Sequence, residues 1–133
     1  MPVNQAEKQQ LAAKQSIEKV PMSGEAKVLF DMLRSKLLWI DTDVIELAEA
    51  KSISYHAPNF FLEVLPRRYR LSLLLGLDFD ELEDPHSIAQ DATRWKFLVN
   101  ASHEGGVLLN VRNASEIEDA LPLVRQAHAA SED

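Results

Sequence analysis

The chain has 133 residues, a net charge of −7 and no cysteine. This length allows one domain with a sizeable core. The lack of cysteine excludes disulfides, thiolate metal sites and thiol catalysis, and the acidic balance makes nucleic acid an unlikely partner and disfavours anionic membranes. No stretch approaches the roughly 20 apolar residues of a membrane span, and residues 1–10 lack the apolar core of a signal peptide. We therefore expect a cytoplasmic protein of bacterial type.

Residues 1–22 are expected to form an N-terminal helical arm, and residues 23–133 a single α+β domain. The arm is rich in Gln, Ala, Lys and Glu, which favour helices, but it has few apolar residues. After a break at Pro21, apolar residues recur at three- and four-residue spacing over residues 25–38. This spacing predicts a core-facing helix capped by Ser23. Residues 43–50 are expected to add a short second helical piece.

Three stretches of alternating apolar residues follow, at 53–55, 60–65 and 69–77. Alternation predicts strands, and the short connections between the stretches predict an antiparallel meander. The acidic residues 78–84 then predict a corner or a single helical turn.

The last third of the chain predicts one more strand and a long helix. Alternation at Phe97, Val99 and Ala101 leaves open whether residues 94–101 are a strand or a helix end. Residues 107–111 predict a strand, and Ser115 with Glu118 forms a capping-box pattern that opens a helix over 116–129. Together the elements predict a two-layer α+β fold, in which a mainly antiparallel sheet of about four strands packs against the N- and C-terminal helices.

The second face of this sheet predicts self-association. One face carries the leucines of the third stretch, and the two helices can cover it. The other face presents Phe61, Leu65, Leu74 and Leu108. Bare apolar patches of this size are rare in monomers. Because the arm has few apolar residues to offer, we expect a homodimer.

Five residues are candidates for ligand binding. His103 precedes a Gly-Gly turn, where glycines allow a ligand to approach the backbone closely. Arg67, Arg68 and Arg70 form the basic cluster of the chain, and Asp91 follows the acidic corner. These residues would form a site if the fold brings them to one concave surface. We predict no catalytic residues, no metal ligands and no cofactor.

A nuclease-like pattern is the main alternative. Glu49 and Lys51, with Asp41 and Asp43 upstream, match the acidic-then-Glu-x-Lys order of magnesium nucleases. That chemistry requires the carboxylates and the lysine to meet at one metal, whereas Glu49 is expected in a helix. The carboxylates of residues 78–84 lack the spacing of a calcium loop, and helix starts often carry such acidic residues.

Several motifs together carry a family resemblance. They are residues 29–34 (LFDMLR), 59–64 (NFFLEV), 71–77 (LSLLLGL), 82–85 (LEDP) and 116–121 (EIEDAL). Residues 28–129 resemble a small bacterial and archaeal domain of unknown function that is often labelled "predicted transport protein". The resemblance implies a glycine-rich turn before the last strand, matched here by His103, Gly105 and Gly106, and it supplies no catalytic residues.

These observations predict a non-enzymatic binding or protein-interaction module. A metal-dependent nuclease or nucleic-acid-processing accessory protein is the alternative, and a small-ligand pocket near His103 is a third possibility. An acid–metal–lysine cluster in one cleft would favour the nuclease.

Overall fold

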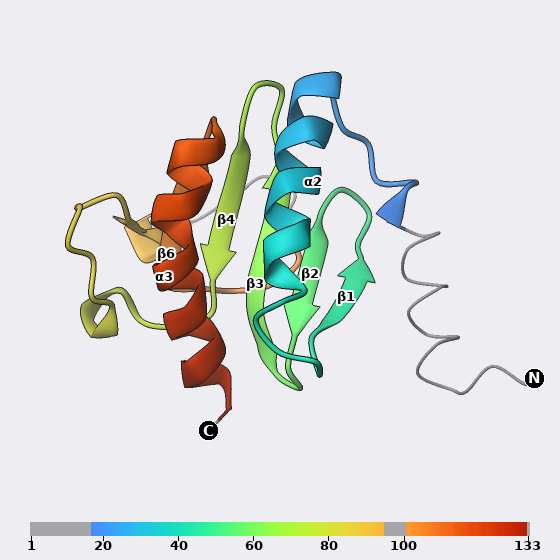
Figure 1. Cartoon of the computed structure of the whole chain (residues 1–133). Coiled ribbons are helices and arrows are strands. Elements are labelled where there is room, and N and C mark those ends of the chain that lie inside the picture. The colour runs from blue at the N-terminus through green and yellow to red at the C-terminus, as the bar shows by residue number, and fades with distance from the viewer. Residues whose placement is uncertain (1–16, 95–100, 133) are drawn as a thin grey trace, which may run out of the picture.

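In the computed structural model, two long helices lie side by side across one face of an antiparallel sheet (Figure 1). The structure describes residues 17–94 and 101–132. The helices are α2 (Gly24–Leu37) and α3 (Ala114–Ser131). The strands are β1 (Ile45–Ala48), β2 (Ile53–His56), β3 (Phe60–Pro66), β4 (Leu71–Leu75), β5 (Gln90–Asp91) and β6 (Val107–Val111). Two 3₁₀ turns, η1 (Phe79–Glu81) and η2 (Ala92–Arg94), complete the described elements.

The α+β prediction is confirmed, but the predicted number of strands was too low. The sheet has six strands in the order β1-β2-β3-β4-β6-β5, and every pair is antiparallel. β2 to β4 form the expected three-stranded meander, β1 extends it by one strand, and β6 then pairs with β4. The two strands that the sequence did not predict, β1 and β5, are the short edges.

The predicted helical piece at residues 43–50 is wrong, because these residues contain β1. In this strand Glu46 pairs with Tyr55 of β2 and turns toward the helices. There its carboxylate accepts two hydrogen bonds from Arg34, both 2.7 Å, and one of 2.8 Å from the Tyr55 hydroxyl. This long-range ion pair fixes an extended conformation that local helix spacing could not reveal.

The helix starts follow capping chemistry. Ser23 caps α2 as predicted, and its side-chain oxygen accepts from the Ala26 amide. α3 begins two residues earlier than predicted, because Asn113 is its cap and accepts from Glu116 N. Glu116 in turn accepts from Arg112 N. The capping pair is therefore Asn113 and Glu116 and not Ser115 and Glu118.

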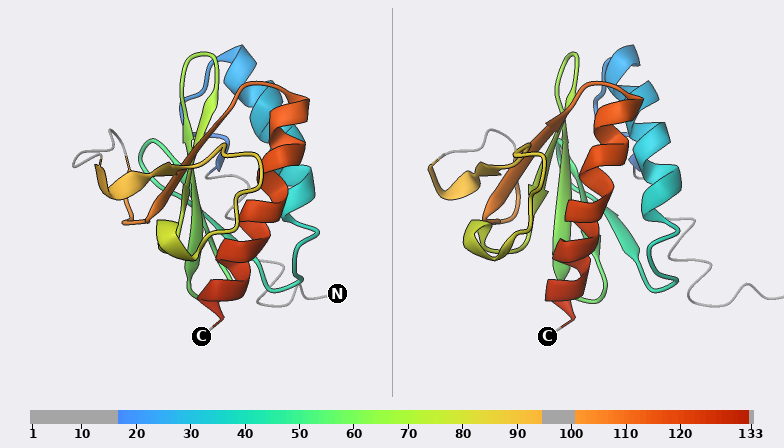
Figure 2. Two further views of the ribbon diagram at one scale, coloured as in Figure 1. Left: turned by 90° about the vertical axis from the view of Figure 1, so that its left-hand side faces the viewer. Right: turned by 60° about the vertical axis from the view of Figure 1, so that its left-hand side comes forward.

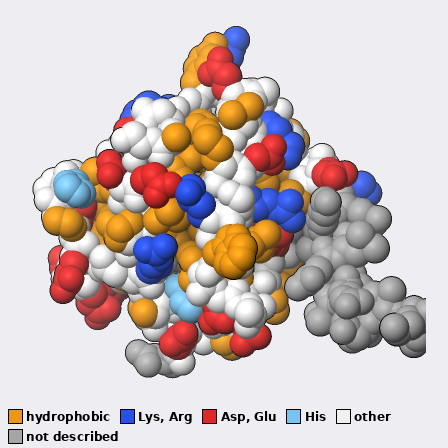
Figure 3. Space-filling model, viewed as in Figure 1, with side chains coloured by type: hydrophobic (Ala, Val, Ile, Leu, Met, Phe, Trp, Pro, Cys, Tyr) orange, Lys and Arg blue, Asp and Glu red, His pale blue; other side chains and the backbone are white. Residues whose placement is uncertain are grey.

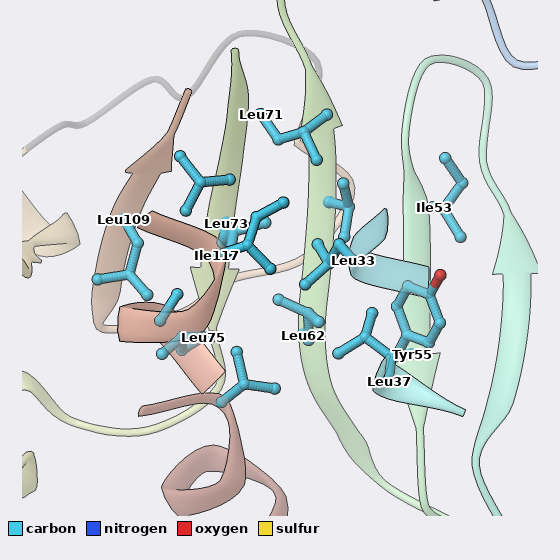
Figure 4. Close-up of a cluster of buried hydrophobic side chains, with 14 of the residues drawn as sticks. Leu33, Leu37, Ile53, Tyr55, Leu62, Leu71, Leu73, Leu75, Leu109 and Ile117 are labelled. Carbon is cyan, nitrogen blue, oxygen red and sulfur yellow. The ribbon is translucent and has the colours of Figure 1, made fainter. Parts of the chain in front are cut away.

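The main core lies between the sheet and the two helices. Figure 4 shows Leu71, Leu73 and Leu75 of β4 in one cluster with Leu33 and Leu37 of α2 and Ile117 of α3. All of these side chains are buried. Ile17 and Val20, from the end of the predicted arm, are also buried in this core. The rest of the arm, residues 1–16, lies outside the described residues. The same holds for residues 95–100, which include most of the stretch whose strand or helix character the sequence left open.

The second face of the sheet is covered by the chain itself. Leu65, Leu74 and Leu108 form a separate buried cluster with Ala92 of η2, and Ala101 packs against it. Figure 2 shows residues 78–94 at the β6 side of the sheet, where the apolar residues from Phe79 to Ala89 pack against the main core and Glu83 exchanges two hydrogen bonds with Gln126 of α3, so of this segment Ala92 is the residue that joins the second cluster. Because these apolar residues are buried within one chain, the reason given for a homodimer does not hold, and the dimer itself stays a prediction.

Phe61 lies on the opposite face from the one predicted. The register of β2 and β3 shifts between Tyr55 and His56, which pair with Leu62 and Phe60. Phe61 is the extra residue of this bulge. The bulge turns Phe61 into the main core, where it is fully buried.

None of the helices within residues 17–94 and 101–132 has the length and hydropathy that a membrane crossing requires.

Candidate functional site

The buried carboxylate of Glu63 is the centre of a polar cluster on the helix-free face of the sheet. Glu63 lies in the middle of β3, opposite Leu74, and is fully buried. One carboxylate oxygen accepts from the Ser52 hydroxyl at 2.5 Å and from Ser102 N at 2.8 Å. The other accepts from His103 N at 2.9 Å. A buried carboxylate is costly unless hydrogen bonds satisfy it, and these three donors do so.

His103, the leading sequence candidate, is held against this carboxylate. Its Nδ1 lies 3.3 Å from Glu63 Oε1, and its ring stacks on Phe60 with 4.3 Å between centroids. The ring of His56 meets His103 edge-on at 5.4 Å. Burial, and secondarily the nearby His103 ring, lower the pKa of His56. The cluster therefore favours a neutral imidazole at His56.

The two glycines after His103 are required by close backbone contact. A Cβ at Gly105 would lie 2.6 Å from the Leu75 carbonyl oxygen and 2.9 Å from Leu74 Cγ. A Cβ at Gly106 would collide with the Leu77 carbonyl oxygen. The Gly-Gly turn thus lets the segment pass directly over β4 into β6, and it needs no ligand to explain it.

Ser54 and His56 resemble a nucleophile and its base, but here the serine hydroxyl does not donate its proton to the histidine. The fully buried Ser54 hydroxyl donates to Glu49 Oε1 at 2.9 Å. Since a hydroxyl has one proton, His56 Nε2, 3.1 Å from Ser54 Oγ, acts as the donor to it. A serine activated by a histidine would need the opposite arrangement, and a substrate could not reach this one.

The arginines lie in and beside the β3–β4 turn, where two of them contact one polar pair. Arg67 Nε donates to Ser72 Oγ at 3.3 Å, and Arg70 Nε donates to Asn110 Oδ1 at 3.1 Å. The Ser72 hydroxyl donates to the same Asn110 oxygen. Burial lowers the pKa of Arg67, and the charge of Arg70 adds to this effect.

Arg68 points elsewhere, with its guanidinium 5.1 Å from the ring centroid of its neighbour Tyr69. Asp91 lies in the edge strand β5 and accepts from the amide and the hydroxyl of Thr93. Within the described contacts, His103 has no hydrogen bond or ring contact with Asp91 or with any of the arginines. The five candidates therefore belong to more than one polar network.

The nuclease-like residues also have separate partners. Glu49 accepts from Ser54, whereas Asp41 lies beside His128 of α3. Among residues 17–94 and 101–132, the group able to offer three metal ligands is Asp41, His128 and Glu132, without Glu49. In the acidic corner, Asp84 accepts from the amides of residues 88 and 89, which is turn chemistry.

Sequence reasoning did not single out Glu63, although a signal was present. Glu63 is the one charged residue in the strand Phe60–Pro66, and a lone carboxylate in an apolar strand indicates a buried polar partner. His56 gave no comparable signal.

Comparisons with models of known protein families, with curated proteins and with solved structures found no match, so the family resemblance stays a prediction.

Proposed function

We propose that this domain is a non-enzymatic protein-interaction module of the cytosol, that its binding surface is the edge of β1, and that its first partner is a second copy of the chain. The observation that carries the proposal is the exposed apolar row of this edge strand. Ile45 is 46% exposed and Leu47 is 45% exposed. They alternate with the buried Glu46 and lie on the face of the sheet without helices.

The position of β1 in the sheet supports this role. It is an outer strand that pairs with β2 on one side, and no described strand pairs with its other side. Natural proteins usually protect such edges with charges or bulges. Here the charge of Glu46 is directed into the ion pair with Arg34, so it does not protect the edge. The connection leading into β1 adds two further exposed apolar side chains, Leu38 and Trp39.

The same ion pair makes β1 a rigid template. Arg34 binds Glu46 with two parallel hydrogen bonds, and this bonding raises the pKa of Arg34. Burial and the adjacent Glu46 raise the pKa of Tyr55 well above its ordinary value, so its hydroxyl remains a donor to that carboxylate. A preorganised edge loses little entropy when another strand adds to it.

A second copy fits this edge by twofold symmetry. Directly opposed residues of an antiparallel pair share a face. If the axis passes through Glu46, Ile45 of one chain therefore lies opposite Leu47 of the other, and both apolar pairs are covered. The two Glu46 side chains then meet on the helix side, where each already has its own Arg34.

An enzymatic role has less support, because the two groups on the helix-free face that could carry chemistry, Glu63 and Ser54, have structural partners. Glu63 is saturated by donors, and the Ser54 hydroxyl is fully buried. The nuclease alternative has no described cluster that joins Glu49 to a metal ligand.

The oligomeric state tests the proposal. Sedimentation equilibrium from about 1 to 100 μM should give a dimer for the native chain and a folded monomer for Leu47→Lys. The matched control is Val28→Lys, which places the same charge on an exposed apolar position of α2, 60% exposed, and should leave the dimer intact. A native monomer of 15.0 kDa throughout this range, or a dimer that survives Leu47→Lys, would contradict the proposal.

A further inference from the structure

His128 near the end of α3 has an unsatisfied ring nitrogen. The residue is only 9% exposed, and its Nε2 is buried without a hydrogen-bond partner. The ring meets Phe61 edge-on, with 5.2 Å between centroids, which fixes its orientation. Buried polar atoms without partners are rare and call for an explanation.

A carboxylate faces this nitrogen without hydrogen-bonding to it. Asp41 Oδ2, from the α2–β1 connection, lies 3.3 Å from His128 Nε2. The distance suits an ion pair, but the oxygen does not lie along the N–H direction. The other oxygen of Asp41 accepts from Asp43 N, and this bond holds the carboxylate in place. His128 Nε2 and Asp41 Oδ2, two potential metal ligands, are therefore close together without a hydrogen bond between them.

A third ligand lies one helical turn beyond His128. Glu132 is four residues later, so it lies on the same side of α3. Its Oε1 is 3.9 Å from His128 Nδ1, whereas an ion beside Asp41 would bind Nε2, so the exposed Glu132 side chain would turn to reach that ion. One ligand atom from each of the three residues can be chosen so that all lie within 4.8 Å of one another. Figure 3 shows acidic side chains gathered at this lower end of the helix-side face.

The distance between His128 and Asp41 matches a metal centre. Two ligand atoms bound to tetrahedral zinc at about 2.0–2.1 Å are about 3.3 Å apart, the distance between His128 Nε2 and Asp41 Oδ2. Imidazole nitrogen with carboxylate oxygens is a donor set that Zn²⁺ accepts. Asp41 and Glu132 are partly exposed, with 33% and 57% of their side chains accessible, so an ion can enter.

We propose that Asp41, His128 and Glu132 bind one Zn²⁺ ion, with water in the remaining position. The ion would replace the missing hydrogen bond of His128 and join the end of α3 to the α2–β1 connection. The site is independent of the proposed function, because it uses no residue of β1.

Zinc titration of the untagged, chelator-treated full chain tests the site. Isothermal titration calorimetry at pH 7.5 should show one Zn²⁺ per chain. Asp41→Asn keeps an oxygen for Asp43 N, yet it should weaken binding about tenfold or more, as should His128→Gln. At ten times the native dissociation constant, zinc should raise the Tm of the native chain by about 5 °C and that of Asp41→Asn by no more than about 1.5 °C.

The other histidines provide the controls. His86→Gln, at an exposed position, and the double variant His56→Gln with His103→Gln should bind zinc as the native chain does. If His128→Gln fails to fold, Asp41→Asn and Glu132→Gln decide the matter, because both positions are partly exposed. The proposal is overturned if the native chain binds no zinc at about 100 μM. Native affinity in both carboxylate variants, or loss of binding in a His56 and His103 variant that is still folded by circular dichroism, would also overturn it.

Discussion

Replacing Glu63 with Gln should destabilise the protein by about 2 kcal/mol. The substitution preserves shape but turns one acceptor oxygen into an amide donor. If the remaining oxygen keeps the bond to His103 N, the new NH₂ faces Ser102 N, which loses its 2.8 Å hydrogen bond and keeps only the longer one of 3.1 Å to that remaining oxygen. The Ser52 hydroxyl can turn round and accept from the NH₂, whereas the backbone amide of Ser102 cannot.

The magnitude follows from these contacts. An amide that faces an NH₂ and keeps only its longer hydrogen bond incurs part of the roughly 1–3 kcal/mol that an unsatisfied buried amide costs, and a hydrogen bond that loses its charge weakens by about 1 kcal/mol. Relief from burying a charge offsets part of this sum. Urea unfolding should show a lower midpoint at an unchanged m value. Hydrogen exchange at Ser102 and His103 should accelerate at least about tenfold, because the segment loses its anchor.

Glu104→Gln is the matched control. It makes the same change one residue beyond His103, at an exposed side chain, and should alter stability by less than about 0.5 kcal/mol. If Glu63→Gln is equally neutral and leaves amide exchange unchanged, the carboxylate does not hold the segment, and the description of the cluster is wrong.

Two further predictions concern the glycines and pH. Gly105→Ala should cost about 1–3 kcal/mol in urea melts, because its Cβ would meet backbone and Leu74; Gly24→Ala, with nothing within 4 Å, should be neutral or stabilising by up to about 1 kcal/mol. The pKa of His56 is lowered in the folded chain, so the unfolded chain binds more protons at a pH near that pKa. The contribution of His56 to stability is therefore present above its unfolded pKa of about 6.5, and it falls as the pH drops toward the folded pKa. His56→Gln should therefore reduce the slope of stability against pH just below 6.5, and an unchanged slope would refute this assignment.

The sequence predicted the elements whose signals are local. The spacing of apolar residues and the Ser23 cap placed α2 to within one residue at each end. Alternation located β2, β3 and β4, because each has one face toward a single large core. The predicted α+β class follows from these elements alone.

The missed features all depend on contacts between distant residues. β1 is extended because Glu46 meets Arg34, and the bulge that turns Phe61 inward depends on how β2 pairs with β3. His103 was predicted as a candidate, but its buried partner is 40 residues away. Asp41 and His128 lie on different elements, and no sequence spacing joins them.

The strand order has a consequence for how this protein is made. β4 is followed in the chain by β5 and only then by β6, yet β6 is the strand that pairs with β4. While the ribosome has not yet released residues 107–131, the growing chain carries an open β4 edge, and Leu71, Leu73 and Leu75 lack the cover of α3. An unpaired edge beside exposed leucines invites aggregation. The nascent protein should therefore depend most on chaperones just before its last strand and helix emerge.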